Sequence, residues 1–205
     1  MGNVRFAKNV GWRGIVDASG SRIGGPLVVA DEAPDEIAIG RIGEGSLVVW
    51  ATPNHVVGRV VGDDAVTRDP FLLEDGVWKD GFRAVVAEAG EGEAAIAWSD
   101  RRVADSHHRV FFARAGETGL RTLPKTVIES LAAHHVIDLE RTENGYVLLV
   151  QEQDGALVVP LNAWGEQVGP SHRYLGISRL YGIAVHESGE MLLVAFREDG
   201  LDAIL

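Results

Sequence analysis

The sequence contains no cysteine. Disulfide bonds, thiolate nucleophiles and zinc sites with cysteine ligands are therefore excluded, while the redox compartment stays open. Basic residues are also few, because 19 lysines and arginines stand against 30 aspartates and glutamates, giving a net charge of −11. A chain of this charge lacks the positive field that attracts phosphates, so neither nucleic acid nor an anionic membrane surface is an expected partner.

Long apolar runs are absent as well. None approaches the roughly 18 residues that a membrane-spanning helix needs, so we expect a soluble chain without membrane insertion. Residues Met1–Phe6 contain no apolar signal segment. Two locations stay open: the cytoplasm if Met1 is the native start, and the cell surface or the outside if the sequence is a piece of a longer chain.

Motifs of the common catalytic and cofactor sites are missing too. The sequence has no phosphate-binding loop, no nucleophile elbow and no paired-histidine zinc helix. We therefore expect no cofactor. What the chain has in abundance is glycine, with 25 residues, in a composition that is 46% hydrophobic and 24% charged. Because glycine supplies the positive φ angles of tight turns, this composition predicts a globular fold of many short strands.

A unit of about 48 residues recurs along the chain. Each copy contains a short apolar run, a polar turn and a second apolar run. The first runs end at Trp50, Trp98, Val150 and Ala195, which are 48, 52 and 45 residues apart. The paired runs are Leu47–Trp50 with Val56–Val61, Ala95–Trp98 with Arg109–Arg114, Val147–Val150 with Ala156–Leu161, and Leu192–Ala195 with Leu201–Leu205.

Other apolar segments precede these pairs and raise the count to four strands in a unit. One set lies directly before each pair, at Glu36–Ile39, Ala84–Ala87, His135–Asp138 and Tyr181–Val185. A further set lies before three of those, at Pro26–Val29, Pro70–Leu73 and Lys125–Ile128. The pattern predicts an all-β fold, a β-propeller-like array of about four to five four-stranded antiparallel blades.

Hydrophobicity distinguishes middle strands from outer ones. Leu47–Trp50, Ala94–Trp98 and Val147–Val150 are continuously apolar, as strands covered on both faces are. The runs Val57–Val60 and Arg109–Arg114 are mixed, which predicts that they are outer strands. Hairpin signals occur at Glu74–Gly76, Glu143–Gly145, Asp154–Gly155 and Asp199–Gly200. Residues 126–133 also fit a short helix, because Thr126 and Glu129 have the spacing of a capping box.

We predict one propeller-like domain over residues 1–205, in units of approximately 1–24, 25–68, 69–122, 123–168 and 169–205. The first unit is partial, so a ring does not obviously close. Three arrangements remain: a segment of a larger propeller, a small ring of four or five blades, or an array that closes by self-association through its strand edges.

One unit carries a family resemblance. The segment Ala95–Arg102, followed by the strand Arg109–Arg114, resembles a repeat of bacterial surface or secreted β-propeller proteins, in which an apolar strand ends in Trp and is followed by Asp and Arg. Trp98, Asp100 and Arg101 match that repeat, and the other units do not. The resemblance implies the propeller fold and a cell-surface location. It implies no single function, because propellers include lectins, hydrolases and scaffolds.

Two groups of residues are candidates for ligand binding. Asp100 with Arg101 or Arg102 could hold a carboxylate or phosphate through a bidentate guanidinium, or could instead tie the end of a strand to the next blade. The tryptophans Trp78 and Trp164 lie outside the regular runs, where they could stack on sugar rings or cap the core. Trp78 also has both charges beside it, since Lys79 and Asp80 follow it in a predicted loop.

Histidines and carboxylates offer weaker candidates. The pairs His107–His108 and His134–His135 could supply metal ligands, but adjacent side chains on a strand point to opposite faces, so we predict solvated loop histidines and no metal site. A glycosidase needs two carboxylates at a set separation, which sequence cannot place.

We therefore predict a non-enzymatic binding or scaffolding module that interacts with a protein partner or associates with itself. A glycan-binding lectin is the first alternative and a glycoside hydrolase-like enzyme the second. Equivalent aromatic and polar residues do not recur at matching loop positions, which favours a protein partner over repeated carbohydrate sites.

Overall fold

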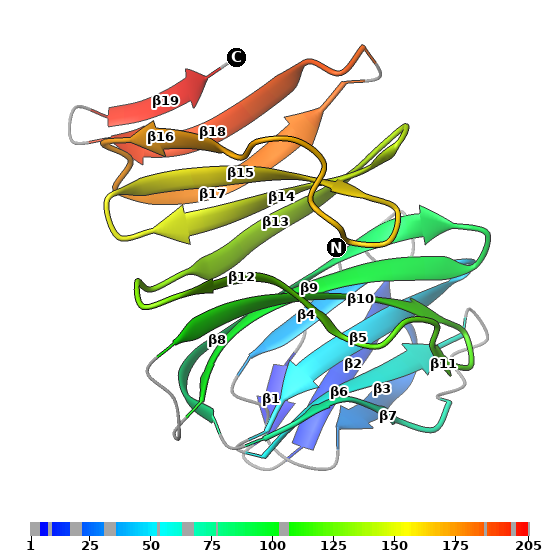
Figure 1. Ribbon diagram of the computed structural model, residues 1–205. Helices are drawn as coiled ribbons and strands as arrows, with labels where there is room; N and C mark the ends of the chain where they lie inside the picture. Colours follow the sequence, from blue (N-terminus) through cyan, green and yellow to red (C-terminus); the bar gives the residue numbers. More distant parts are fainter. Residues whose placement is uncertain are drawn as a thin grey trace.

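The computed structural model consists of strands and turns throughout the residues that it describes (Figure 1). The backbone is described for residues 5–7, 10–16, 22–30, 36–52, 54–62, 68–76, 78–102, 107–186, 188–197 and 200–204. Side chains are described for residues 36–52, 54–62, 68–76, 82–101, 107–186, 188–196, 200 and 203. Within these ranges no helix is long and apolar enough to cross a bilayer.

The strands form five antiparallel sheets, named here in chain order. The first sheet contains β1 (Arg5–Ala7), β2 (Val10–Val16) and β3 (Arg22–Ala30), and the second contains β4 (Ile37–Ile42), β5 (Gly45–Ala51), β6 (His55–Val61) and β7 (Phe71–Asp75). The third contains β8 (Trp78–Gly90), β9 (Glu93–Arg102), β10 (His108–Gly116), β11 (Gly119–Leu120) and β12 (Lys125–Ser130). The fourth contains β13 (His135–Thr142), β14 (Gly145–Glu152), β15 (Gly155–Asn162) and β16 (His172–Leu175), and the fifth contains β17 (Arg179–Val185), β18 (Met191–Arg197) and β19 (Gly200–Ile204).

Every sheet is a meander in which each strand pairs with its neighbour in the chain, apart from β12, which pairs with β10. The first strands of the later sheets, β4, β8, β13 and β17, lie next to one another in series. We call them the inner strands. Figure 1 shows the sheets stacked from the second, near the bottom of the view, to the fifth at the top. This arrangement confirms the predicted all-β array of antiparallel sheets.

The boundaries of the sheets differ from the boundaries of the predicted sequence units. The segments Pro26–Val29, Pro70–Leu73 and Lys125–Ile128 open three units, yet they lie in β3, β7 and β12 and pair with the sheet before them. Consequently β6 and β10 are the third strands of their sheets, and the prediction that they are outer strands is wrong. The burial of β10 agrees with its interior place, since only two of its side chains are partly exposed.

Two of the predicted hairpins are confirmed. Turns at Glu143–Asn144 and Gln153–Asp154 join β13 to β14 and β14 to β15. The hairpin predicted at Glu74–Gly76 is wrong, because this turn leads from the outer strand of the second sheet to the inner strand of the third. The fourth signal includes Asp199, which lies outside the described residues.

The alternative of a helix over residues 126–133 is also wrong. Residues Lys125–Ser130 form β12, which pairs with β10 from His108 to Phe112. The capping-box spacing reflects only a local preference for a helix. Val127 and Ile128 pack against the core between the third and fourth sheets, and burial of these β-branched side chains against a sheet favours a strand over a helix.

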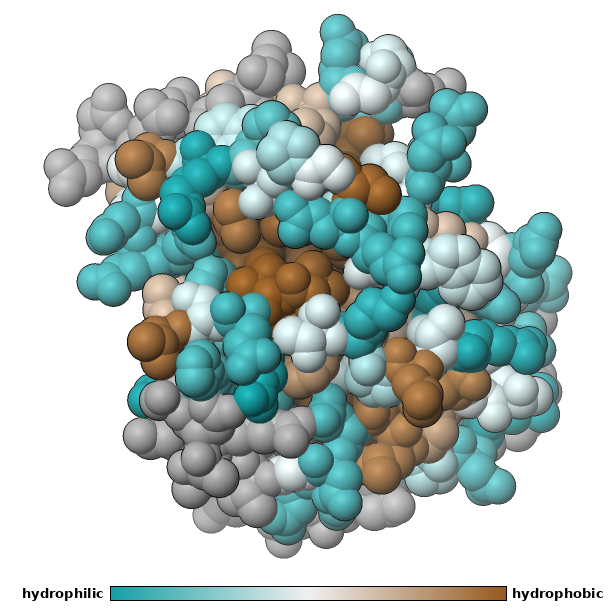
Figure 2. Space-filling view, viewed as in Figure 1, coloured by the Kyte–Doolittle hydropathy of each residue, from teal (hydrophilic) through white to brown (hydrophobic). Residues whose placement is uncertain are grey.

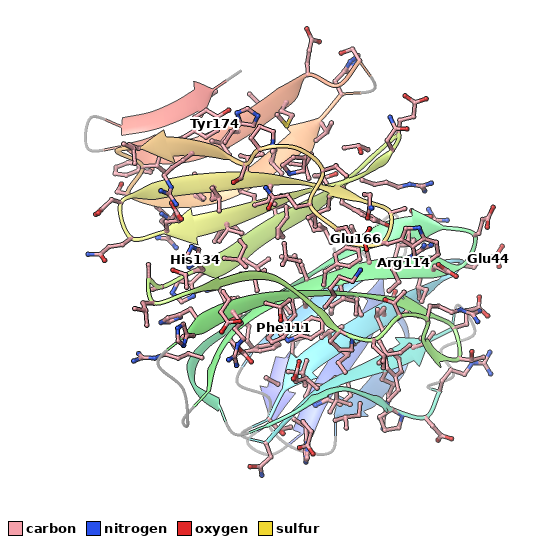
Figure 3. The ribbon with its side chains drawn as sticks, viewed as in Figure 1. Glu44, Phe111, Arg114, His134, Glu166 and Tyr174 are labelled. Atoms are coloured by element: carbon pink, nitrogen blue, oxygen red, sulfur yellow. The ribbon has the colours of Figure 1, made fainter. Side chains whose placement is uncertain are left out.

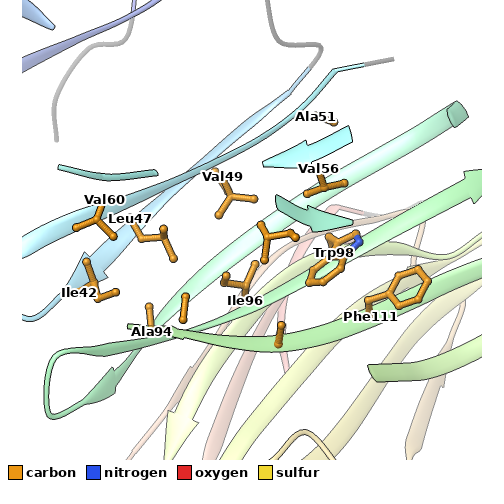
Figure 4. Packing of buried hydrophobic residues seen from close by; sticks show 14 of the residues in the cluster. Ile42, Leu47, Val49, Ala51, Val56, Val60, Ala94, Ile96, Trp98 and Phe111 are labelled. Carbon is orange, nitrogen blue, oxygen red and sulfur yellow. The ribbon is translucent and has the colours of Figure 1, made fainter. Parts of the chain in front are cut away.

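The core consists of apolar layers between successive sheets. One cluster joins the second sheet to the third (Figure 4), a second joins the third to the fourth, and a further one joins the fourth to the fifth. The middle strands β5, β9 and β14 are therefore buried on both faces over most of their length. Trp98 of β9 is the largest fully buried side chain, and its ring stacks on Phe111 at a centroid distance of 5.4 Å.

Side-chain oxygens add polar links between sheets. The backbone N–H of Val136 in β13 donates to Oγ of Ser99 in β9 (3.3 Å), and the N–H of Leu180 in β17 donates to Oε1 of Gln151 in β14 (2.8 Å). The two acceptors occupy equivalent positions, one residue after Trp98 and Val150. Both inner strands shift register at this point, so the side chain satisfies an N–H that the bulge removes from the ladder.

Candidate functional site

The two predicted ligand-binding groups meet at one end of the third sheet. In the β8–β9 register Trp78 lies opposite Arg102, and Asp80 lies opposite Arg101. The loop predicted for Trp78–Asp80 is wrong, because these residues begin β8. The side chains of Trp78, Lys79, Asp80 and Arg102 lie outside the described residues, so their roles stay predictions.

Asp100, the centre of the second group, lies inside the sheet. Its residue is only 1% exposed, and it stands opposite Arg109 of β10 in the ladder. Arg109 in turn reaches Glu129 of β12 at 3.4 Å. A carboxylate buried in this way presents no open surface to a ligand, which favours the alternative that Asp100 ties the strand end to its surroundings.

A second charged cluster lies where the third and fourth sheets meet. His134 is buried, with Nδ1 2.8 Å from the carbonyl oxygen of Ala132 and Nε2 3.1 Å from Oε1 of Glu152. Arg173 of β16 binds the same carboxylate through Nε (2.6 Å) and an Nη (2.9 Å). Both ring nitrogens of His134 therefore face oxygen atoms, which leaves neither nitrogen for a metal ion or a substrate proton.

The predicted solvated histidines are thus wrong at two positions. His134 and His108 are both buried. His108 begins β10 and pairs with Arg101 of β9 and Ser130 of β12, and His134 lies in the link before β13, where it contacts Ala132 and Glu152. Among the described residues no three histidine or acidic side chains converge as metal ligands would.

The inner strand β13 carries two neighbouring carboxylates, Asp138 and Glu140. Burial, followed by the nearby charge of Asp138, raises the pKa of Glu140 above the ordinary value. Asp138 accepts the backbone N–H of Leu139 through Oδ1 (2.9 Å) and that of Ile183 in β17 through Oδ2 (3.1 Å). With both oxygens engaged by backbone, Asp138 serves as another link between the fourth and fifth sheets.

A second carboxyl group with a raised pKa is that of Glu36, which precedes β4. Burial raises this pKa, and Arg83 at 3.9 Å partly offsets the effect. Glu36 precedes β4 of the second sheet and Glu140 lies in β13 of the fourth, with the inner strand β8 of the third sheet between them. Glycosidases place their two carboxyl groups about 5 to 9.5 Å apart, so Glu36 and Glu140 do not form such a pair.

Trp164 occupies the loop that follows β15, and 58% of its surface is exposed. The guanidinium of Arg114 in β10 lies 5.2 Å from the centre of its ring. Two residues further on, Glu166 accepts a hydrogen bond from Nζ of Lys125 (2.9 Å), and this bond together with one from Asn162 lowers its pKa. Figure 3 shows Arg114 and Glu166 at the same end of the molecule. The loop therefore connects the fourth sheet to the third.

The fifth sheet has an uncovered apolar face. Tyr181 of β17 is 53% exposed, and Leu192 and Phe196 of β18 are 37% and 41% exposed. Their neighbours Leu193 and Ala195 point the other way and are buried against the fourth sheet. We call the side of β17 and β18 that carries Tyr181, Leu192 and Phe196 the open face.

Two grooves lie around the fifth sheet. A shallow apolar groove of about 620 Å³ lies at the hairpin end of β17 and β18 and is lined by Ala184, Met191 and Leu192. A more polar groove of about 650 Å³ separates the hairpin of β13 and β14 from that of β17 and β18, with Arg141, Asn144 and His186 in its wall. Figure 2 shows a further apolar hollow between β12 and the fourth sheet, on the side of the molecule that it presents.

Sequence reasoning did not find the open face. The signal was present, because Met191–Phe196 is continuously apolar, as the doubly covered strands β5, β9 and β14 are, and no later sheet follows it within the described residues. A continuously apolar strand is expected to be covered on both faces, so the exposed face of β18 was not predicted.

No protein-family model and no curated protein sequence matches the chain. Solved structures do match. An exo-β-1,3-galactanase from Phanerochaete chrysosporium, in complex with galactose, is 13% identical with a TM-score of 0.50, over 96% of this chain and 48% of the other. The Dos1 propeller is 11% identical with a TM-score of 0.52, over 95% of this chain and 54% of the other. A protein from Lactobacillus plantarum is 10% identical with a TM-score of 0.51, over 100% of this chain and 66% of the other.

These similarities bear on the fold alone, because the identities are low. Together with the sheet topology they confirm the predicted β-propeller-like architecture. The chain spans about half the length of the galactanase and of the Dos1 propeller.

Proposed function

We propose that the chain is a non-enzymatic assembly module whose binding surface is the open face of the fifth sheet. A β-sheet of a second copy of the chain covers that face. The exposure of Tyr181, Leu192 and Phe196 on adjacent strands is the observation that carries this proposal. Large apolar side chains gathered on one sheet face are typical of interaction surfaces.

Comparison with the other sheets supports a sheet as the occupant. The middle strands β5, β9 and β14 place buried apolar side chains on both faces, and neighbouring sheets cover both faces of β9 and β14. β18 has the same composition, but among the described residues a neighbouring sheet packs against one side of it only. A further sheet, stacked as the third stacks on the second, would bury the remaining side chains.

A second copy is the natural source of that sheet. In a stack of similar units each unit offers its neighbour one of two complementary surfaces, so a second copy supplies sheets of the kind that would cover the open face. Position 196 carries phenylalanine where Ser99 and Gln151 supply polar links. The equivalent residue of the second sheet is Ala51, and the second and third sheets pack through apolar contacts there. An apolar junction of this type needs no polar link.

The solution mass tests the proposal. We expect sedimentation equilibrium to show a concentration-dependent association of the 22.0 kDa chain into a dimer or a larger discrete species. Phe196→Ser and Leu192→Ser should each shift the midpoint of association to at least about tenfold higher concentration, because each removes a large apolar group from the interface.

Leu131→Ser is the matched control. Leu131 is 71% exposed but lies in the link between β12 and β13, away from the open face, so its replacement should leave association unchanged. A wild-type protein that stays monomeric at every concentration would overturn the proposal, and so would equal effects of the Leu131 and Phe196 replacements.

A further inference from the structure

We propose that Trp164 and the polar side chains around it form a binding site for a neutral oligosaccharide. The site lies on the loop that follows β15 and is separate from the open face of the fifth sheet. It stands on the geometry of the loop and would operate in a monomer as well as in an assembly.

The backbone of this loop is held firmly. Oδ1 of Asn162 accepts the N–H groups of Trp164 and Glu166, both at 2.9 Å, and Nδ2 of the same amide donates to Oε2 of Glu166 (3.0 Å). Gly165 has a φ of +76°, and a side chain there would collide with Phe112 of the third sheet, since an added Cβ would lie 2.1 Å from that ring. The loop is thus clamped between two sheets, so a ligand meets an indole whose position is already fixed.

Arg114 orients the indole ring of Trp164 by packing against one of its faces. Arg114 stacks against it at 5.2 Å and is itself held by an ion pair with Glu93. Glu93 also lies 3.6 Å from Nε of Arg121. With the guanidinium on one side, the exposed surface of Trp164 provides a flat apolar platform. A pyranose ring presents a matching apolar face of C–H groups to such a platform.

Polar side chains are linked to the loop and to Arg114 through Glu166 and Glu93, and their groups match sugar hydroxyls. Arg121, Lys125 and Glu166 are all about half exposed, and the amide of Asn162 is nearby. Lys125, Asn162 and Glu166 are held by hydrogen bonds among themselves, and Arg121 by its ion pair with Glu93. An aromatic platform with a few oriented polar groups is the pattern of a carbohydrate site.

Charge selects a neutral ligand over an acidic one. Locally the three cations Arg114, Arg121 and Lys125 are paired with the two carboxylates Glu93 and Glu166, which leaves a single positive charge without a carboxylate of its own. The net charge of −11 also repels acidic glycans at long range.

A glycan array of neutral β-linked glucans, galactans, mannans and xylans, printed beside acidic glycans, tests the proposal. We expect at least one neutral oligosaccharide to bind, and we expect titration calorimetry with that compound to give about tenfold weaker binding for Trp164→Ala. Trp164→Phe keeps a flat ring and should retain most of the affinity. Leu175→Ala is the control, because Leu175 is 70% exposed at the opposite end of the same sheet, and it should bind as the wild type does.

Absence of any neutral hit at millimolar ligand would overturn the proposal, as would unchanged binding by Trp164→Ala or binding of acidic glycans alone. Thermal melting of each variant separates loss of the site from loss of the fold. If Trp164→Ala unfolds, the fluorescence of the wild type on titration decides: a ligand-dependent change that Trp164→Phe lacks supports the site, and its absence contradicts it.

Discussion

Trp98 and Trp164 have the same side chain in opposite environments. Trp98 is fully buried between the second and third sheets and stacks on Phe111, whereas Trp164 is mostly exposed and lies against the guanidinium of Arg114. Since the first belongs to the core and the second to a surface loop, their replacement should affect the free energy of unfolding very differently.

We predict that Trp98→Ala lowers the free energy of unfolding by about 3 to 5 kcal/mol, because it leaves a large cavity in the core. Trp164→Ala should lower it by about 0.5 to 1 kcal/mol, the usual value of an exposed cation–π contact. Urea denaturation monitored by circular dichroism measures both. Losses of similar size would contradict the assignment of Trp164 to the surface.

Glu140 provides a prediction on pH. Burial, and then Asp138, raises the pKa of its carboxyl group in the folded protein. Between the pKa of the unfolded chain and this raised value the folded state binds more protons, so stability falls as the pH rises through that interval. Glu140→Gln should therefore be more stable than the wild type at neutral pH, and the difference should shrink as the pH falls through the raised pKa of Glu140 to its ordinary value of 4.5. A difference that stays constant across a pH series of urea melts would show that the carboxyl group is not perturbed.

At the scale of elements, the junction of the fourth and fifth sheets depends on Gln151. Its Nε2 donates to the carbonyl oxygens of Glu152 and Gly155, both at 2.8 Å, while Oε1 accepts the N–H of Leu180. One side chain thus joins the turn after β14 to the inner strand β17.

We predict that Gln151→Ala lowers the free energy of unfolding by about 1 to 3 kcal/mol, because it leaves partly buried backbone groups without a partner. Amides of β17 should also exchange with deuterium faster than those of β14. Gln167→Ala is the control, since this exposed amide bonds only within its own loop and its loss should change stability by no more than about 0.5 kcal/mol. Equal exchange rates in β17 of the two variants would contradict the role of Gln151.

The inner and middle strands could be predicted from the sequence, and the outer strands could not be assigned. Continuous apolar runs such as Val147–Val150 identify strands covered on both faces, since burial itself produces that pattern. The sequence does not show which strand β7 or β12 pairs with, because their sequences fit an edge of the preceding sheet and an edge of the following sheet equally well. Pairing across a distance depends on register and packing that a local pattern does not contain.

The candidate site shows the same division. The position of Trp164 outside the regular strands could be predicted from the sequence, but its exposure and its contact with Arg114, 50 residues earlier, could not. The histidines show the reverse error, because His134 occupies a loop and is nevertheless buried by its contacts with Ala132 and Glu152. Burial of a loop residue depends on how the loop folds back, which composition does not encode.

At the scale of the whole molecule, the sheets form a stack that is apolar at its last described end. Three apolar layers separate the second sheet from the third, the third from the fourth and the fourth from the fifth. The open face repeats the composition of those layers without a partner among the described residues. A stack of this kind is stabilised when a further sheet covers that face.

Hydroxyl-radical footprinting over a dilution series tests this account most directly, because it reports the exposure of individual side chains. We predict that Tyr181, Leu192 and Phe196 become protected as the protein concentration rises, while Leu131 and Leu175 are oxidised equally throughout. Oxidation of Tyr181, Leu192 and Phe196 at the same high rate at every concentration would contradict the assignment of the open face as the surface on which the chain assembles.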